Sequence, residues 1–156
     1  MRNRNYWLVK SEPTSYSYED LQNEPEQTAE WDGVRNFQAR NNLRRMQLGD
    51  GVLFYHSNAK PSAIVGLATV AAESYPDHTA WDPNSDHPDP KSTPEAPIWY
   101  MVDVKASASL KLPISLDVVK STPGLENMML LKNSRLSVQS VTVQEWEILM
   151  EISEFN

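Results

Sequence analysis

Apolar residues fall into short runs along the chain, and polar segments containing proline or glycine separate them. The first run is centred on Trp7-Leu8-Val9, a continuous apolar stretch typical of a buried strand. The polar segment 58–61 lies between two later runs and predicts a hairpin. In all, the pattern predicts strands at residues 5–10, 52–55, 62–72, 99–105 and 136–141.

The best-defined helix is predicted to begin after Asn36, whose side chain is suited to capping a helix. It runs to about Met46 and ends by Gly49, because glycine is the usual residue just past a helix. The inward positions are predicted to be Phe37, Leu43 and Met46, and the polar face to carry Arg40, Arg44 and Arg45.

Further capping signals predict short helices elsewhere, and two segments are predicted to be loops. Ser17 and Asp20 predict a cap for a helix toward Leu21, and Thr142 with Glu145 predicts one for a C-terminal helix. Helical segments are also predicted at 115–122 and 125–131, and loops at 23–32 and 75–97. Because the second loop is long and rich in proline, we expect it to be functional or mobile.

The order of these elements predicts the class of fold. Short strands alternate with short capped helices, without the regular spacing of βαβ units. We therefore expect one α+β domain spanning residues 1–156, with a mixed, mostly antiparallel curled sheet that closes into a small β-barrel with peripheral short helices.

Composition and charge narrow the function. Cysteine is absent, which excludes a disulfide framework, a thiol nucleophile and a cysteine-based zinc site. The net charge of −7 argues against gripping nucleic acid by bulk electrostatics, yet residues 33–60 carry five basic side chains against Asp50 alone. The apolar run 6–9 is too short for a signal peptide, and 63–72 is too short to span a bilayer. We therefore expect a cytoplasmic monomer with no membrane partner, which recognises its ligand through a pocket.

Motifs for cofactors, metals and catalysis are missing from the sequence. There is no glycine-rich phosphate loop and no metal-ligand spacing of histidines. Residues 82–86 imitate the start of a calcium loop, but His87 stands where glycine is needed and Thr93 where glutamate is needed. Since His56 and Ser57 are adjacent on a strand, they point to opposite faces and cannot pair as base and nucleophile. We expect no cofactor, no metal and no catalytic residue.

Two tryptophans are candidates for a binding surface. Trp31 and Trp81 lie in polar or proline-rich surroundings, outside any periodic apolar pattern. They either stack on a ligand or fill the mouth of the barrel as satellite core residues. The other three tryptophans, Trp7, Trp99 and Trp146, follow strand or helix patterns and are predicted to be core residues.

Polar side chains near these aromatics complete the candidate set. A site that reads one nucleobase needs aromatic faces for stacking and a few fixed donors and acceptors for the base edge. The candidate polar groups are Lys10, Ser11, Glu12, Arg35, Asn36, His56, Ser57, Arg135, Ser137 and Gln139. The alternative is capping and surface solvation, and it is strongest for Asn36 as a helix cap.

Seven motifs together resemble the EVE domain family of the PUA-like superfamily. They are WLVKSEP at 7–13, WDGVRN at 31–36, GD at 49–50, FYHS at 54–57, AWDP at 80–83, WYMVDV at 99–104 and RLSVQ at 135–139. The resemblance covers about 6–150 in order, with Phe37 and Gly51 as departures from the residues expected there. It implies a PUA-like barrel with helices, related to readers of methylated adenine in RNA, and a pocket for modified cytosine or a similar base.

The resemblance also implies roles for particular residues. Trp31 and Trp81 would be stacking or wall aromatics, and Arg35, Asn36, His56 and Ser57 would contact the base edge or phosphate. Ser11, Glu12 and Gln139 are secondary ligand-binding candidates, and Tyr55 would be buried support. The partner would be DNA or RNA that contains a modified base.

Two other functions stay open on the sequence alone. The chain could be a hydrolase acting on a small amide or nucleoside, with His56 and either Glu12 or Asp82 as acid and base. It could also be a protein-interaction module that uses the acidic second part of the chain.

Overall fold

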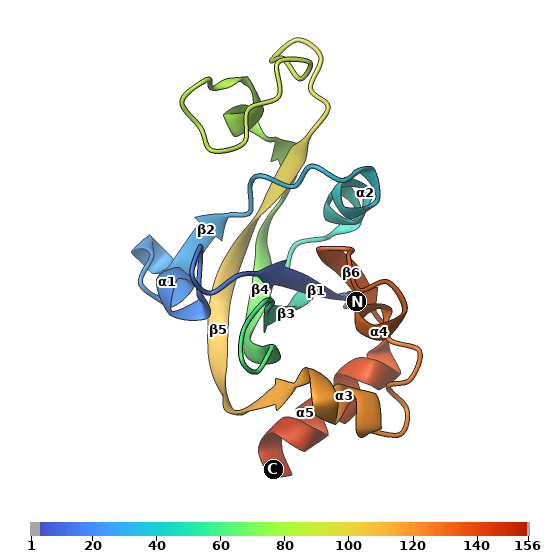
Figure 1. The fold of residues 1–156 in the computed structure, drawn as a ribbon. Coiled ribbons are helices and arrows are strands. Elements are labelled where there is room, and N and C mark those ends of the chain that lie inside the picture. The colour runs from blue at the N-terminus through green and yellow to red at the C-terminus, as the bar shows by residue number, and fades with distance from the viewer. Residues whose placement is uncertain (1–3, 156) are drawn as a thin grey trace.

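The computed structural model describes residues 4–155 and contains one mixed six-stranded sheet, in the order β2-β5-β4-β3-β1-β6 (Figure 1). β1 pairs with β3 in parallel, and the other neighbours are antiparallel. The strands are β1 (Tyr6–Ser11), β2 (Thr28–Glu30), β3 (Gly51–His56), β4 (Ala63–Pro76), β5 (Tyr100–Ser115) and β6 (Val138–Val141).

Short helices connect and flank these strands. They are α1 (Tyr18–Gln22), α2 (Phe37–Arg45), α3 (Leu116–Ser121), α4 (Met129–Lys132) and α5 (Val143–Phe155), with 3₁₀ turns η1 (Pro25–Gln27) and η2 (His78–Trp81). Both predicted capping boxes are present: Ser17 with Asp20 opens α1, and Thr142 with Glu145 opens α5. The Asn36 side chain accepts from the Ala39 N–H at 2.9 Å, which confirms it as the cap of α2.

The central strands are buried on both faces, which explains their continuous apolar sequences. In β1, Trp7 and Val9 belong to one core cluster, whereas Leu8 belongs to a second. Because successive side chains of a strand point to opposite faces, the two clusters lie on opposite sides of the sheet. The first cluster includes Leu43 of α2, and the second includes Leu149 of α5.

The expected mixed α+β architecture is confirmed, but closure into a barrel is not seen. Within residues 4–155, β2 and β6 stand at opposite ends of the strand order and do not pair with each other. The long β4–β5 hairpin contains four register shifts, and such bulges bend and twist a sheet without closing it.

Two predictions about the first half of the chain are wrong. Part of the predicted 23–32 loop forms the edge strand β2, whose backbone pairs with β5 although its side chains carry no apolar pattern. Phe37 was predicted to point inward but is 60% exposed, and one face of its ring stacks on Trp99. Trp99 itself is buried, as predicted. Ala39, Asn42 and Leu43 are the buried residues of α2.

The segment 77–99 forms a lobe that projects beyond the sheet from the ends of β4 and β5 (Figure 1). The lobe is closed at its base, where the Asp77 N–H donates to the Trp99 carbonyl at 2.9 Å. Internal hydrogen bonds from Asp89 to Ala80 and from Ile98 to the buried Ser92 organise the rest. The predicted loop 75–97 is therefore a folded element with a defined interior.

Candidate functional site

A cavity of about 510 Å³ opens where the end of β1, β2 and the segment before α2 meet. Its volume falls in the range of small-molecule and cofactor sites. Three residues to which the family resemblance gives a ligand role line it: Ser11, Trp31 and Arg35. Two further candidate polar groups from the sequence, Lys10 and Ser137, line it as well. The remaining lining residues are Tyr16, Glu24, Ala29, Glu30, Asp32, Gly33 and Val34.

Trp31 forms an aromatic wall of this cavity. Its backbone N–H donates to the Val102 carbonyl at 2.8 Å, which continues the β2–β5 pairing by one residue. Its half-buried ring packs edge-on against two other aromatic rings. The distance between ring centroids is 5.4 Å to Phe54 of the core and 6.2 Å to Tyr16. Among the described residues no acceptor lies within hydrogen-bond reach of the indole Nε1, so this N–H is available to a ligand.

The floor near Trp31 contains polar groups held in fixed orientations. The Tyr16 hydroxyl donates to Glu24 Oε2 at 2.8 Å, and the Ser11 hydroxyl donates to the Tyr16 carbonyl at 2.6 Å. Burial and the Glu24 carboxylate raise the pKa of Tyr16 above its ordinary value, so the hydroxyl keeps its proton. The Lys10 ammonium donates to the Ser134 carbonyl, and burial lowers the pKa of Lys10.

Carboxylates give the cavity an acidic character. Glu24, Glu30 and Asp32 line it together with the two basic residues Lys10 and Arg35. Glu30 accepts from the Tyr75 hydroxyl at 3.3 Å through Oε2, and His87 Nε2 lies 3.4 Å from Asp32 Oδ2. Each of these interactions involves one oxygen of its carboxylate, which leaves the other oxygen for an incoming donor.

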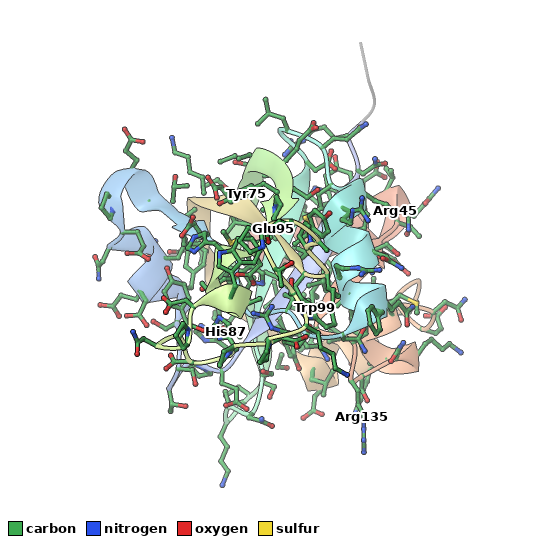
Figure 2. The ribbon with its side chains drawn as sticks, turned by 90° about the horizontal axis from the view of Figure 1, so that it is seen from above. Arg45, Tyr75, His87, Glu95, Trp99 and Arg135 are labelled. Carbon is green, nitrogen blue, oxygen red and sulfur yellow. The ribbon has the colours of Figure 1, made fainter. Side chains whose placement is uncertain are left out.

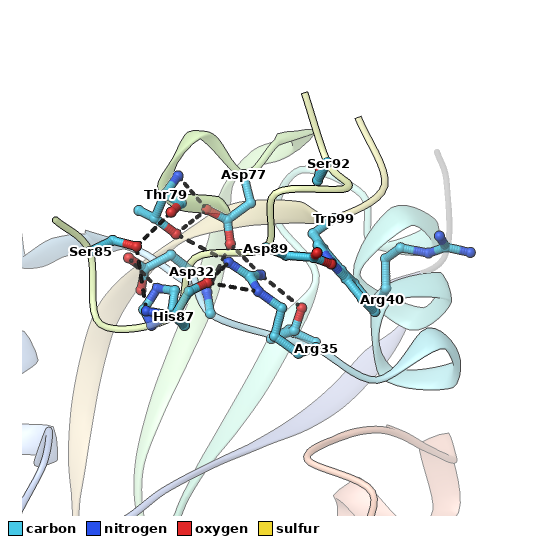
Figure 3. A network of polar contacts seen from close by, with 12 residues as sticks. Asp32, Arg35, Arg40, Asp77, Thr79, Ser85, His87, Asp89, Ser92 and Trp99 are labelled. Atoms are coloured by element: carbon cyan, nitrogen blue, oxygen red, sulfur yellow. Dashed lines mark hydrogen bonds and ion pairs between the residues drawn. The ribbon is translucent and has the colours of Figure 1, made fainter. Parts of the chain in front are cut away.

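Arg35 joins the cavity to the projecting lobe (Figure 3). Its Nε and Nη2 donate to the His87 carbonyl at 3.2 and 2.8 Å, and Nη1 donates to the Val34 carbonyl at 3.1 Å. Nη1 also pairs with Asp77 at 3.0 Å, and Nη2 contacts the Thr79 hydroxyl at 3.4 Å. A guanidinium has five N–H donors, and these five contacts occupy them. Arg35 therefore positions the cavity wall, instead of offering a free fork to a ligand.

Asp77 receives this arginine in a buried position. Burial alone raises the pKa of a carboxyl, but hydrogen bonds from Thr79, the Gly33 N–H and Arg35 outweigh it and hold the pKa of Asp77 below its usual range. Since the Gly33 N–H donates at 2.8 Å, Asp77 also fixes the turn that carries Trp31 and Asp32.

Several predicted site residues lie elsewhere and have structural partners. His56 Nε2 accepts from the Tyr18 N–H at 3.1 Å at the start of α1, and burial lowers the pKa of His56. Tyr55 is 3% exposed within the core, as expected for buried support. Ser57 bonds through its backbone to Ser11 at 3.0 Å. The histidine on which the hydrolase alternative depends is therefore oriented toward the backbone of α1 and does not line the cavity.

The other predicted residues are also outside the cavity lining. Trp81 lies half-buried in η2 of the lobe, so the two loop tryptophans do not enclose one slot. Asn36 caps α2, and the Glu12 carboxylate accepts from the Asn58 amide. Gln139 is fully buried and donates to the Asn133 and Leu136 carbonyls at 3.2 and 2.9 Å.

Sequence reasoning missed Tyr16, Glu24 and Glu30 as lining residues. All three lie in or near segments interpreted as polar loop or helix cap, which carry no periodic signal. Lys10 and Ser137 were noted as polar groups but were not assigned to the site. A search for carboxylates flanking Trp31 in the sequence would have found Glu30 and Asp32.

The described residues contain no metal-binding cluster and no membrane-spanning helix. No group of three or more His, Asp or Glu side chains in 4–155 is arranged to hold a metal ion. No helix in that range is long and apolar enough to cross a membrane.

Comparisons with known proteins place the chain in a family. The EVE domain matches residues 5–152. Thymocyte nuclear protein 1 of Rattus norvegicus is 46% identical to this chain, and the match covers 96% of this chain and 74% of the relative. The Homo sapiens protein is 44% identical with the same coverage of both chains.

Solved structures agree with this match. A hypothetical protein from Leishmania major superposes with a TM-score of 0.93 at 45% identity, covering 97% of this chain and 96% of that one. Human THYN1 protein in complex with 5-methylcytosine-containing DNA superposes with a TM-score of 0.93 at 42% identity, covering 97% and 99%. An ASCH protein variant from Zymomonas mobilis, at 11% identity and a TM-score of 0.56, shares the fold alone. Since the match extends over every strand described in 4–155 and over the segment around Trp31, this chain belongs to the EVE domain family.

Proposed function

We propose that this protein is a non-catalytic nucleic-acid-binding module that holds one modified base, with 5-methylcytosine as the candidate, in the cavity beside Trp31. The observation that carries the proposal is the half-buried indole of Trp31, which lines a cavity of about 510 Å³ together with fixed polar groups. The structure of a 42% identical relative with 5-methylcytosine-containing DNA supports the choice of ligand.

The lining suits cytosine in particular. The exocyclic amine of cytosine is a hydrogen-bond donor, and Glu or Asp side chains are its usual acceptors. Glu30 and Asp32 flank Trp31 and supply such acceptors. The indole N–H of Trp31 and the ammonium group of Lys10 supply donors for the carbonyl oxygen of the cytosine ring. Ala29 and Val34 give the wall apolar surface for a methyl group.

The acidic lining also indicates which part of a nucleotide enters. Three carboxylates disfavour a phosphate inside the cavity but accept a base edge that donates hydrogen bonds. A base reaches such a cavity only when it is unstacked, so the ligand is single-stranded or has the base extruded. Whether the strand is DNA or RNA is decided outside the cavity, by contacts to the sugar.

The test compares the loss of Trp31, which lines the cavity, with the loss of Trp81, which does not. Binding of a fluorescent oligonucleotide with one central 5-methylcytosine is measured by anisotropy for wild type, Trp31→Ala and Trp81→Ala. Loss of a base–aromatic stack of ~1–3 kcal/mol predicts about a 5- to 150-fold weaker complex for Trp31→Ala. Trp81→Ala is the matched control and stays within about twofold of wild type by the same stacking argument.

The methyl group gives a second readout. Burial of one methyl is worth about 0.8 kcal/mol, so the methylated oligonucleotide binds about fourfold more tightly than the unmodified one. Melting curves of both variants establish that they are folded. Unchanged affinity in a folded Trp31→Ala variant, or a loss confined to Trp81→Ala, would show that the ligand binds elsewhere.

A further inference from the structure

Phe37 is an aromatic residue in an unusual position for a soluble protein, because it opens α2 and is 60% exposed. One face of its ring stacks on Trp99, with centroids 4.9 Å apart and planes inclined by 26°. The Arg40 guanidinium carbon lies 4.9 Å from the Phe37 ring and 6.0 Å from the Trp99 ring. These distances place Arg40 beside the stack, since a group on the outer face of Phe37 would lie much farther from Trp99. The outer face of Phe37 is therefore open.

The helix that begins at Phe37 presents positive charge to solvent. α2 contains Arg40, Arg44 and Arg45 and no acidic residue, although the chain as a whole has a net charge of −7. Arg44 lies 4.4 Å over the Tyr100 ring and makes no hydrogen bond to the residues at 4–155, so its donors face outward. Figure 2 shows Arg45 beside the same helix, drawn in cyan. Arg45 lies over the Trp7 ring at 5.7 Å.

This surface is continuous with the cavity. Arg35 lines the cavity, and its guanidinium carbon lies 5.7 Å from the centroid of Trp99. Trp99 also stacks with Phe37, so this one indole contacts both a residue of the cavity wall and the exposed ring. From Phe37 to Arg44 and Arg45 the helix rises about 10–12 Å, which lets one short strand segment touch both ends.

We propose that Phe37, Arg44 and Arg45 form a second contact for the same strand, in which a nucleotide flanking the base in the cavity stacks on Phe37 and its phosphates pair with Arg44 and Arg45. The proposal rests on the function proposed above and adds the partner surface outside the cavity. Arg45 Nη1 contacts the Asn42 side-chain oxygen at 3.5 Å, but neither Arg44 nor Arg45 forms an ion pair with a carboxylate of residues 4–155. An open aromatic face beside guanidinium groups without counter-charges matches a planar base joined to phosphates, as in single-strand-binding sites. A purely apolar partner would leave these arginines without counter-charges.

The experiment compares a ligand that can fill the cavity alone with one that can also reach α2. The probes are free 5-methyldeoxycytidine and a short single-stranded DNA with one central 5-methylcytosine, both titrated by calorimetry. The variants are Phe37→Ala and the double variant Arg44→Gln with Arg45→Gln. The controls are Leu112→Ala, another exposed apolar residue, and Lys111→Gln with Lys120→Gln on the exposed β5–α3 segment.

For the oligonucleotide, loss of one stacked base predicts an affinity lower by about 5- to 150-fold in Phe37→Ala. The double arginine variant lowers the slope of log affinity against log salt concentration by about 1.4, because each phosphate contact on a single strand contributes about 0.7. Both variants bind the free nucleoside like wild type, and the controls leave both ligands unchanged.

The outcomes separate this proposal from the function on which it rests. If Trp31→Ala weakens binding of both probes while the Phe37 and arginine variants match wild type, the cavity function stands and the α2 contact is overturned. If Trp31→Ala binds both probes like wild type but the α2 variants lose oligonucleotide affinity, the cavity function falls and the surface stands. If the α2 variants lose the nucleoside as strongly as the oligonucleotide, the residues act through the fold, and the proposal is overturned.

Discussion

The Nη1 atom of Arg35 lies 3.0 Å from the Oδ2 atom of Asp77, whose side chain is fully buried. This ion pair joins the segment before α2 to the start of the projecting lobe, two parts of the chain separated by more than forty positions. Because Arg35 also lines the cavity and Asp77 also holds the Gly33 N–H, the pair links the shape of the cavity to the position of the lobe.

Replacing Arg35 with lysine tests this link. Lysine keeps the charge but loses the planar fork that reaches both Asp77 and the His87 carbonyl. Breaking a buried pair costs about 3–5 kcal/mol, and because Arg35 is 21% exposed and lysine keeps the charge we expect a smaller loss, of about 2 kcal/mol. Urea unfolding measures this loss of stability. The rate of amide hydrogen exchange in residues 78–92 measures how far the lobe loosens. Arg135→Lys, at an exposed position, is the control. An unchanged exchange pattern in the variant would refute the link.

Gly33 and Gly49 form a natural pair for separating backbone strain from packing. Both have positive φ, +79° and +86°, so alanine at either costs about 1–2 kcal/mol of stability. A Cβ at Gly33 would lie 2.9 Å from the His87 ring, whereas at Gly49 nothing lies within 4 Å. We expect both variants to be destabilised and only Gly33→Ala to lose ligand affinity, as measured by anisotropy. If Gly33→Ala and Gly49→Ala bind the ligand equally well, the His87 ring moves aside without changing the cavity.

His56 predicts a pH dependence of stability. Burial lowers its pKa from 6.5, because the folded protein disfavours the charged ring, which accepts the Tyr18 N–H while neutral. The unfolded chain then binds more protons in this window, so the stabilisation is complete above about pH 6.5 and is lost as pH falls through the folded pKa. Denaturant unfolding from pH 7.5 to 5 should show a steeper loss for wild type than for His56→Gln.

Asp50 stabilises the starts of the neighbouring strands β1 and β3. Its buried carboxylate accepts from the Trp7 indole at 3.0 Å and from the Gln47 and Asn5 N–H groups at 2.9 and 3.2 Å. Asp50→Ala leaves these donors unpaired, and the loss of charge-assisted bonds costs about 2–4 kcal/mol. Thermal unfolding measures the loss, and Asp86→Ala, at an exposed position, serves as control. A melting temperature equal to that of the control would mean that water replaces the carboxylate.

The local elements of this fold were readable from the sequence because their causes are local. The caps at Ser17, Asn36 and Thr142 each join a side chain to a backbone N–H three residues away. Edge strand β2 was missed because its pairing partner, β5, is far away in the sequence and its own three side chains form no apolar pattern. Phe37 was misplaced for a related reason: the ring that it stacks on, Trp99, comes from the lobe.

The helix caps, the buried strands and the family resemblance are written in neighbouring residues and could be read from the sequence. Which candidate residues share a cavity could not be read there, because it depends on contacts between positions far apart along the chain. The folded chain settles it. It brought Lys10, Tyr16 and Ser137 to Trp31 and left Trp81 in the lobe. It also turned Arg35 from a candidate ligand contact into a support, since its five donors are satisfied by a lobe whose folded position no local pattern encodes.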